Sequence, residues 1–83
     1  MDKVYYFMDG NDRCRFRCLQ KDGNLVYEVA MIEVCDDGTV EVFYLERFRE
    51  LDNALNTMES KGVFDMPFYP PEEELAFWEN VCI

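Results

Sequence analysis

The side chains of this sequence that could do covalent or metal chemistry are carboxylates and four cysteines: Cys14, Cys18, Cys35 and Cys82. Histidine, the commonest general base and metal ligand, is absent from all 83 residues. Cys14 and Cys18 fall on one predicted strand, where four residues of separation place them about 13 Å apart, too far for a disulfide. Because there is no C-x-x-C pair and the other cysteines are scattered, we expect free, buried thiols rather than a zinc site.

Other motifs of catalysis are also missing. A cysteine nucleophile would lack its histidine partner, and the sequence contains neither a G-x-x-x-x-G-K-[ST] loop nor G-x-G-x-x-G. No apolar pocket is predicted that would raise the pKa of one carboxylate. The turn at 36–38 lacks the further ligands of a calcium loop. We therefore predict a protein that is not an enzyme and uses no cofactor or metal.

Net charge is the strongest functional signal. The chain has 18 Asp and Glu against 8 Lys and Arg, a formal charge of −10, which disfavours direct binding to nucleic acid because phosphates attract cationic surfaces. A hydrophobic content of 49% is too high for a disordered acidic tail, so a folded surface carries the acids. The chain shows no export signal and no apolar run long enough for a bilayer. We expect a cytoplasmic protein that does not contact a membrane.

Three turn signals divide the first half of the chain into strand-like segments. The turns fall at 9–12, 21–24 and 36–39, and the segments at 3–8, 13–20, 25–35 and 40–48. Asp-Gly between β-rich runs is typical of tight hairpins, because glycine takes the positive φ that these turns need. We predict one α+β domain over 1–83: a four-stranded antiparallel β-meander in 1–47, then two helices in 48–83 joined by a loop rich in aromatics and proline, with at least one helix packed on the sheet.

The turns also predict the register, and the register assigns the two faces of the sheet. The predicted pairs are Phe7 with Cys14, Tyr6 with Arg15, Arg17 with Glu28, Met31 with Tyr44, Ile32 with Phe43 and Cys35 with Val40. The first face is almost wholly apolar and forms the core: Tyr5, Phe7, Cys14, Phe16, Cys18, Tyr27, Val29, Met31, Val40, Val42 and Tyr44. The second face is mixed, with Arg13, Arg15 and Arg17 at one edge and Ile32, Val34, Phe43 and Leu45 at the other.

Two helices are predicted after the sheet. Residues 48–62 place Phe48, Leu51, Ala54, Leu55 and Met58 at helical spacing and end at Gly62, so this helix covers the first face and points Asp52, Asn56 and Glu59 outward. A second helix begins at Pro71, which is followed by Glu72, Glu73 and Glu74. The apolar side of this helix contains Leu75, Phe77, Trp78, Val81 and Cys82. It either covers the apolar patch of the second face or leaves that patch for a partner.

The order of three strands and a helix carrying F-x-x-L-x-x-A-L (Phe48, Leu51, Ala54, Leu55) is similar to AP2-type domains and recombinase arm-binding domains. The resemblance covers about half of the chain and implies a sheet-plus-helix fold. Those DNA-reading families are basic whereas this chain is acidic, so their function is not carried over.

The acids are densest in the helical third, where residues 48–83 carry eight acids and two bases. One interpretation is a solvated, helix-capping face. The other is an imitation of phosphate charge on one acidic flank. Compact, strongly acidic domains of this kind resemble phage-encoded anti-defence proteins, including DNA mimics and anti-CRISPR proteins. This resemblance implies an inhibitor or antagonist whose partner is a basic, nucleic-acid-handling protein. The predicted partner-binding residues are Asp52, Glu59, Glu72, Glu73 and Glu74 for charge and Tyr69 as an aromatic anchor.

Two alternatives involve the second face of the sheet. The first is a homodimeric assembly or accessory module whose interface contains Tyr6, Arg15, Arg17, Ile32, Phe43 and Leu45. The second is direct nucleic-acid binding through Arg13, Arg15 and Arg17, whose side chains point the same way. The purely structural reading of the same arginines is an Arg17–Glu28 pair and a stack of Arg15 on Tyr6.

Overall fold

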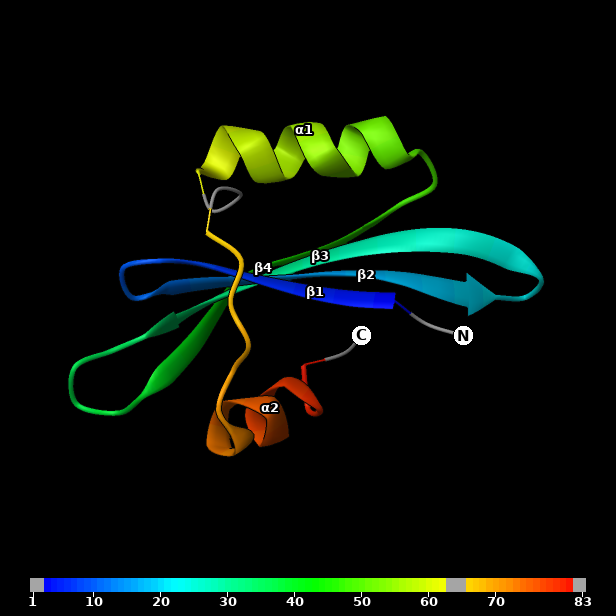
Figure 1. Ribbon diagram of the computed structural model, residues 1–83. Helices are drawn as coiled ribbons and strands as arrows, with labels where there is room; N and C mark the ends of the chain where they lie inside the picture. The colour runs from blue at the N-terminus through cyan, green and yellow to red at the C-terminus, as the bar shows by residue number, and fades with distance from the viewer. Residues whose placement is uncertain (1–2, 63–65, 82–83) are drawn as a thin grey trace.

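In the computed structural model, which describes residues 3–62 and 66–81, the chain forms a four-stranded sheet with one helix on each face (Figure 1). Strands β1 (Lys3–Asp9), β2 (Asp12–Lys21), β3 (Asn24–Val34) and β4 (Val40–Phe48) form an antiparallel meander in sequence order. Helices α1 (Leu51–Lys61) and α2 (Glu72–Trp78) follow. This architecture confirms the predicted α+β fold. Among the described residues, no helix is long and apolar enough to cross a membrane.

Turn chemistry sets the register of the first three strands as predicted. Asp22 and Gly23 both have positive φ, 53° and 80°, the combination of a type I′ hairpin turn. This two-residue turn places Arg17 opposite Glu28. In the first hairpin Phe7 faces Cys14 and Tyr6 faces Arg15, so these predicted pairs are also confirmed.

The β3–β4 hairpin departs from the predicted register at a bulge. Met31 faces Tyr44 as predicted, but Ile32 faces Val42 and leaves Phe43 as an extra residue in β4. The predicted pairs Ile32–Phe43 and Cys35–Val40 are therefore wrong. The physical reason is a longer loop than the Asp-Gly signal suggested. The Cys35 amide donates to the Thr39 carbonyl at 2.8 Å, and the Asp37 carboxylate accepts from the Thr39 amide and hydroxyl.

The bulge moves the first residues of β4 to the opposite face from the one predicted, because side chains alternate along a strand. Val40 packs in the cluster under α2 instead of the core under α1. Val42 is 47% exposed and Phe43 51% exposed, so neither belongs to a closed core. The assignment of Val40 and Val42 to the apolar face is corrected accordingly.

Helix α1 closes the core on the first face. Met31 and its sheet neighbours Cys14, Phe16 and Val29 pack against Ala54 and Met58 of α1. The helix ends where predicted, since Gly62 has φ 80° and its amide donates to the carbonyls of Met58 and Glu59. It starts later than predicted: Phe48 is the last residue of β4, and Leu51 is 42% exposed.

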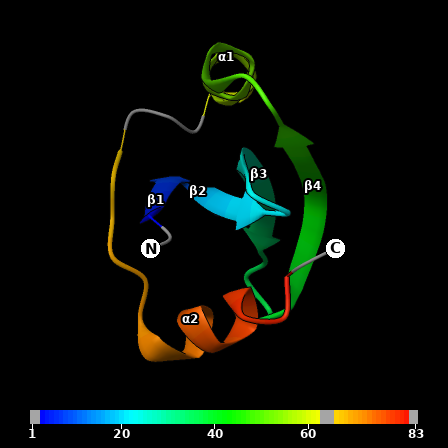
Figure 2. The ribbon, with the colours of Figure 1, turned by 90° about the vertical axis from the view of Figure 1, so that its right-hand side faces the viewer.

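Helix α2 covers the second face, which confirms intramolecular cover of the apolar patch. Ile32 and Ala30 of the sheet are buried with Trp78 and Val81. The chain reaches this side along the β1 edge (Figure 2), where residues 66–68 bond to β1 through Met8 N–Met66 O (2.9 Å) and Phe68 N–Tyr6 O (3.0 Å). The predicted contribution of Cys82 lies outside the described residues.

A substitution in α1 tests the first core. Met58→Ala should lower the free energy of unfolding by about 2–5 kcal/mol, because it empties a fully buried site between helix and sheet. Leu51→Ala, a matched control on the same helix, should cost less than about 1.5 kcal/mol since Leu51 is partly solvated already. Urea denaturation of both variants is the measurement, and equal losses would contradict the described packing.

Candidate functional site

The second face contains a buried carboxylate held by three arginines, which we call the arginine cluster (Glu28, Arg15, Arg17 and Arg47). Glu28 is fully buried and its β2 and β4 neighbours in the register are Arg17 and Arg47. Arg17 binds both carboxylate oxygens, at 2.6 and 3.1 Å. Arg15 donates to Oε1 at 2.7 Å and Arg47 to Oε2 at 3.2 Å. Three cations therefore share one carboxylate.

Arg15 connects this cluster to α2. Its side chain is 3% exposed and donates to the carbonyls of Trp78 and Val81 at 2.8 and 2.7 Å. Its guanidinium lies 5.0 Å from the centroid of the Trp78 ring, so the predicted stacking partner Tyr6 is corrected to Trp78. The interaction holds the end of the helix because carbonyls at a helix C-terminus are unpaired acceptors with partial negative charge.

The cluster shifts the protonation equilibria of both buried groups. Burial opposes ionisation of Glu28, but the hydrogen bonds and charges of Arg17 and Arg15 outweigh it and hold the pKa of Glu28 below its usual value. Burial, together with repulsion from Arg17, lowers the pKa of Arg15. Glu28 is thus stabilised as the carboxylate.

In the structure the predicted arginine stripe makes its contacts within the protein, since Arg13, Arg15 and Arg17 all form ion pairs with glutamates of the same chain. Arg13 bonds Glu74 at 3.2 Å and the Gly10 carbonyl at 2.6 Å, and its guanidinium lies 5.3 Å from the Phe68 ring. The structural reading of the stripe is confirmed for Arg17 and Glu28. A nucleic-acid surface built from these three arginines would have to break these bonds.

The alternative dimer interface is also largely covered. Ile32 is fully buried beneath α2, and Tyr6 and Leu45 are half-buried beside it. Of its apolar members only Phe43 is exposed. In this structure the chain's own helix α2 covers most of this predicted interface.

Because most of the arginines pair with glutamates inside the protein, the exterior is more acidic than the composition suggests. Four of the five arginines bond Glu28 or Glu74. Among the described residues, thirteen acidic side chains are exposed but only four basic ones, Lys3, Lys21, Arg49 and Lys61. The acids therefore dominate the surface.

Four of the acids form a row across the sheet, which we call the acid row (Asp9, Asp12, Glu33 and Glu41). The register places Asp9 opposite Asp12, Asp12 opposite Glu33, and Glu33 opposite Glu41. Neighbouring strands lie about 4.8 Å apart, and like charges directly opposite one another are destabilising. Within the described ranges, none of the four forms an ion pair.

The acid row lies at the end of the sheet where two hairpins meet. The β3–β4 loop adds Asp36 and Asp37, both exposed, and the Asn11 amide of the β1–β2 turn lies 3.4 Å from Asp36. We call this surface the acidic end: the acid row with Asp36 and Asp37. Glu74 of α2 adjoins it through its bond to Arg13, the neighbour of Asp12.

The predicted partner-binding residues do not gather into one surface. Asp52 and Glu59 are exposed on α1, whereas Glu72 and Glu73 are exposed on α2, across the sheet (Figures 1 and 2). Glu74 is half-buried against Arg13, and Tyr69 is 86% exposed near the β1 edge. The predicted single flank of both helices is thus corrected, because the helices pack on opposite faces.

The sequence contained part of the signal for the acid row. The first two predicted hairpin registers already align Asp9, Asp12 and Glu33, but a bulge-free β3–β4 register puts Val42 opposite Glu33. The bulge shifts β4 by one residue and brings Glu41 into the row. Charge density along the chain pointed instead to the helices.

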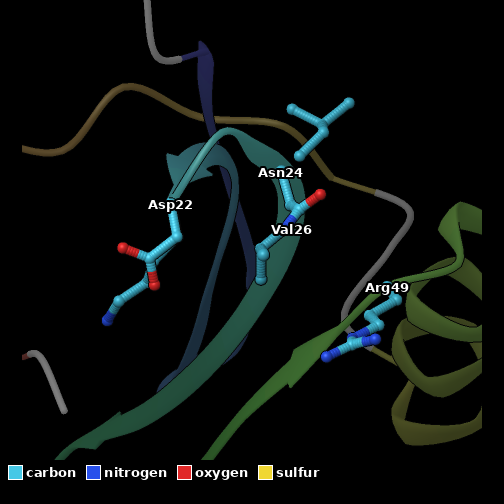
Figure 3. Close-up of a pocket in the computed structure, with 6 residues that line it drawn as sticks. Asp22, Asn24, Val26 and Arg49 are labelled. Atoms are coloured by element: carbon cyan, nitrogen blue, oxygen red, sulfur yellow. The ribbon is translucent and has the colours of Figure 1, made fainter.

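A cavity of about 360 Å³ lies at the other end of the sheet, between the β2–β3 hairpin and Arg49 (Figure 3). Its polar side chains are Lys21, Asp22, Asn24 and Arg49. The buried thiol of Cys14 is elsewhere, and burial raises its pKa to about 12, which keeps it unreactive. Among the described residues, no group of three or more cysteines and carboxylates could hold a metal ion.

Comparisons with protein-family models, with curated proteins and with solved structures gave no significant match.

Neutralising Glu28 tests the arginine cluster. Glu28→Gln should lower the free energy of unfolding by about 3–5 kcal/mol near pH 7, because it leaves a buried Arg15 without its counter-charge. The control Glu59→Gln, at an exposed position of α1, should change the free energy of unfolding by less than about 0.5 kcal/mol.

The stabilisation by the Glu28 carboxylate depends on pH in a defined direction. Since the folded-state pKa of Glu28 lies below the ordinary value of 4.5, its stabilisation is complete above that value and is lost as the pH falls through the folded pKa. The difference between wild type and Glu28→Gln should therefore shrink on acidification. A difference that grows towards low pH, measured by urea denaturation at a series of pH values, would contradict this assignment.

The acid row should cost stability. Glu33→Gln removes a carboxylate that faces two others and should raise stability by about 0.2–1 kcal/mol. The gain should shrink at high salt, since screening weakens repulsion between exposed charges. Thermal denaturation at low and high ionic strength checks this, and a destabilised Glu33→Gln at low salt would show that the row is not repulsive.

Proposed function

We propose that this protein is a non-enzymatic inhibitor that binds a cationic, nucleic-acid-handling protein through its acidic end. The observation that carries the proposal is the acid row: four carboxylates set directly opposite one another in the register without an ion pair in the described part of the chain. Such an arrangement weakens the fold. A binding role, in which a basic partner neutralises the row, explains why it is present.

The charge distribution supports a partner that normally binds phosphates. A line of carboxylates spaced by about 4.8 Å presents regularly repeated negative charge, as a nucleic-acid strand does. A groove of Lys and Arg side chains that neutralises phosphates can neutralise such a line as well. The surplus of exposed acids would also accelerate the encounter with a cationic protein.

An exposed aromatic residue lies close to the row along the chain. Phe43 is two residues after Glu41 in β4 and is 51% exposed at the bulge. Interfaces derive most of their binding energy from a few large side chains, with charged groups around them. In the proposed complex Phe43 supplies apolar contact while the acid row supplies steering and charge complementarity. Glu72, Glu73 and the exposed Tyr69 would lie further out.

The proposal can be tested by affinity capture and competition. Immobilised wild-type protein in a nuclease-treated lysate of the source cell should retain a basic nucleic-acid-binding protein that is released by high salt and by excess duplex DNA. The variant Asp9→Asn/Asp12→Asn/Glu33→Gln/Glu41→Gln should bind the captured protein at least about tenfold more weakly, because several charge pairs are lost together.

A variant of equal net charge provides the matched control. Asp22→Asn/Glu50→Gln/Asp52→Asn/Glu59→Gln neutralises four exposed acids outside the acid row and should retain most of the affinity. Equal losses in both variants would show that net charge alone acts. Capture that duplex DNA does not displace, or no capture by the wild type, would overturn the proposal.

A further inference from the structure

A second cavity lies on the second face of the sheet, the face that α2 covers, between strands β1 and β2 and helix α2. Its volume is about 250 Å³. Val4 and Leu75 form apolar walls, Tyr6 and Trp78 aromatic ones, and Arg15 and Arg17 supply cations. We call it the arginine pocket. It is separate from the acidic end and does not rest on the proposed function.

The charges beside this pocket are not balanced. Within the described residues, Glu28 is the one carboxylate bonded to Arg15, Arg17 and Arg47. These bonds leave two positive charges uncompensated, of which Glu79, a lining residue of the pocket, offsets one. Arg15 is further compensated by two backbone carbonyls. Arg17 and Arg47 keep about a fifth of their side-chain surface exposed. Partly buried cations without full compensation favour the binding of an anion.

The pocket residues also have more hydrogen-bond donors than acceptors. Arg17 uses Nε and Nη2 on Glu28, and within the described residues Nη1 has no acceptor. Nε of Arg15 and Nε1 of Trp78 are buried without an acceptor in the part of the chain that the structure describes. The phenol of Tyr6, whose pKa burial raises further, is protonated near neutral pH and can donate. An incoming oxyanion would supply the missing acceptor.

The walls of the pocket restrict the kind of anion. The apolar and aromatic side chains that line it suit a ligand with an apolar or aromatic body, and the volume suits a small molecule. Glu79 also lines the pocket, and its negative charge disfavours a dianion such as a phosphate monoester. We infer that the arginine pocket binds a small carboxylate with an apolar or aromatic body, its carboxylate bonded to Arg17.

The single tryptophan of the chain allows a direct test, because Trp78 lines the pocket. Titration with phenylacetate should change the Trp78 fluorescence saturably, with a Kd on the order of 1 mM or tighter for a ligand of this size. Acetate, which lacks the body, and inorganic phosphate should each bind at least about tenfold more weakly. The neutral analogue 2-phenylethanol should give no saturable change.

Two variants separate binding from folding. Arg17→Gln should weaken phenylacetate binding at least about tenfold, but it also removes a partner of Glu28. Val4→Phe keeps every charge and fills the pocket from the edge strand, so it should abolish the response. Val42→Phe is its matched control, since Val42 is a similarly exposed strand valine that is not among the pocket residues.

The inference is overturned by any of three results with folded protein: no saturable response to phenylacetate, equal binding of 2-phenylethanol, or wild-type affinity in Val4→Phe. Isothermal calorimetry at the same concentrations confirms that the fluorescence change reports binding. None of these readouts involves the acid row, so failure here leaves the proposed function untouched, and the converse also holds.

Discussion

The buried carboxylate of Glu28 is the group on which the rest of the structure depends. It receives arginines from β2 and β4 and so links the three strands that make up the middle and one edge of the sheet. Through Arg15 it also holds the carbonyls at the end of α2. A short helix of seven residues is marginal alone, and this connection together with the burial of Trp78 holds it on the sheet.

This cluster also separates the charges of the molecule. Because four arginines are committed to Glu28 and Glu74, few cations remain to balance the exposed acids. The exterior is acidic while one internal cluster is cationic. Protonation of Glu28 at low pH removes the charge that holds Arg15.

Two surfaces of opposite character follow from this separation. The acidic end presents repeated negative charge, which suits a large cationic partner. The arginine pocket presents donors within apolar walls, which suits a small anion. The acid row and the arginine pocket lie on different faces of the sheet, because side chains alternate along a strand. Glu33 belongs to the row, whereas its neighbour Ile32 packs under α2, on the face of the pocket.

The sequence by itself determined the first two hairpins, whose turn signals Asp22-Gly23 and Gly10-Asn11 led to the Arg17–Glu28 pair and to most of the apolar face under α1. Helical spacing and Gly62 determined the end of α1. These features depend on contacts near in the chain or on strict alternation. Only the tertiary structure decided the bulge at Phe43, the contact of Arg15 with Trp78 and the side of the sheet that α2 covers. Each of these depends on the packing of segments far apart in the chain, and the local sequence pattern contains no information about that packing. The acid row combines both kinds of information: turn chemistry aligned three of its members, and packing around a longer loop added Glu41.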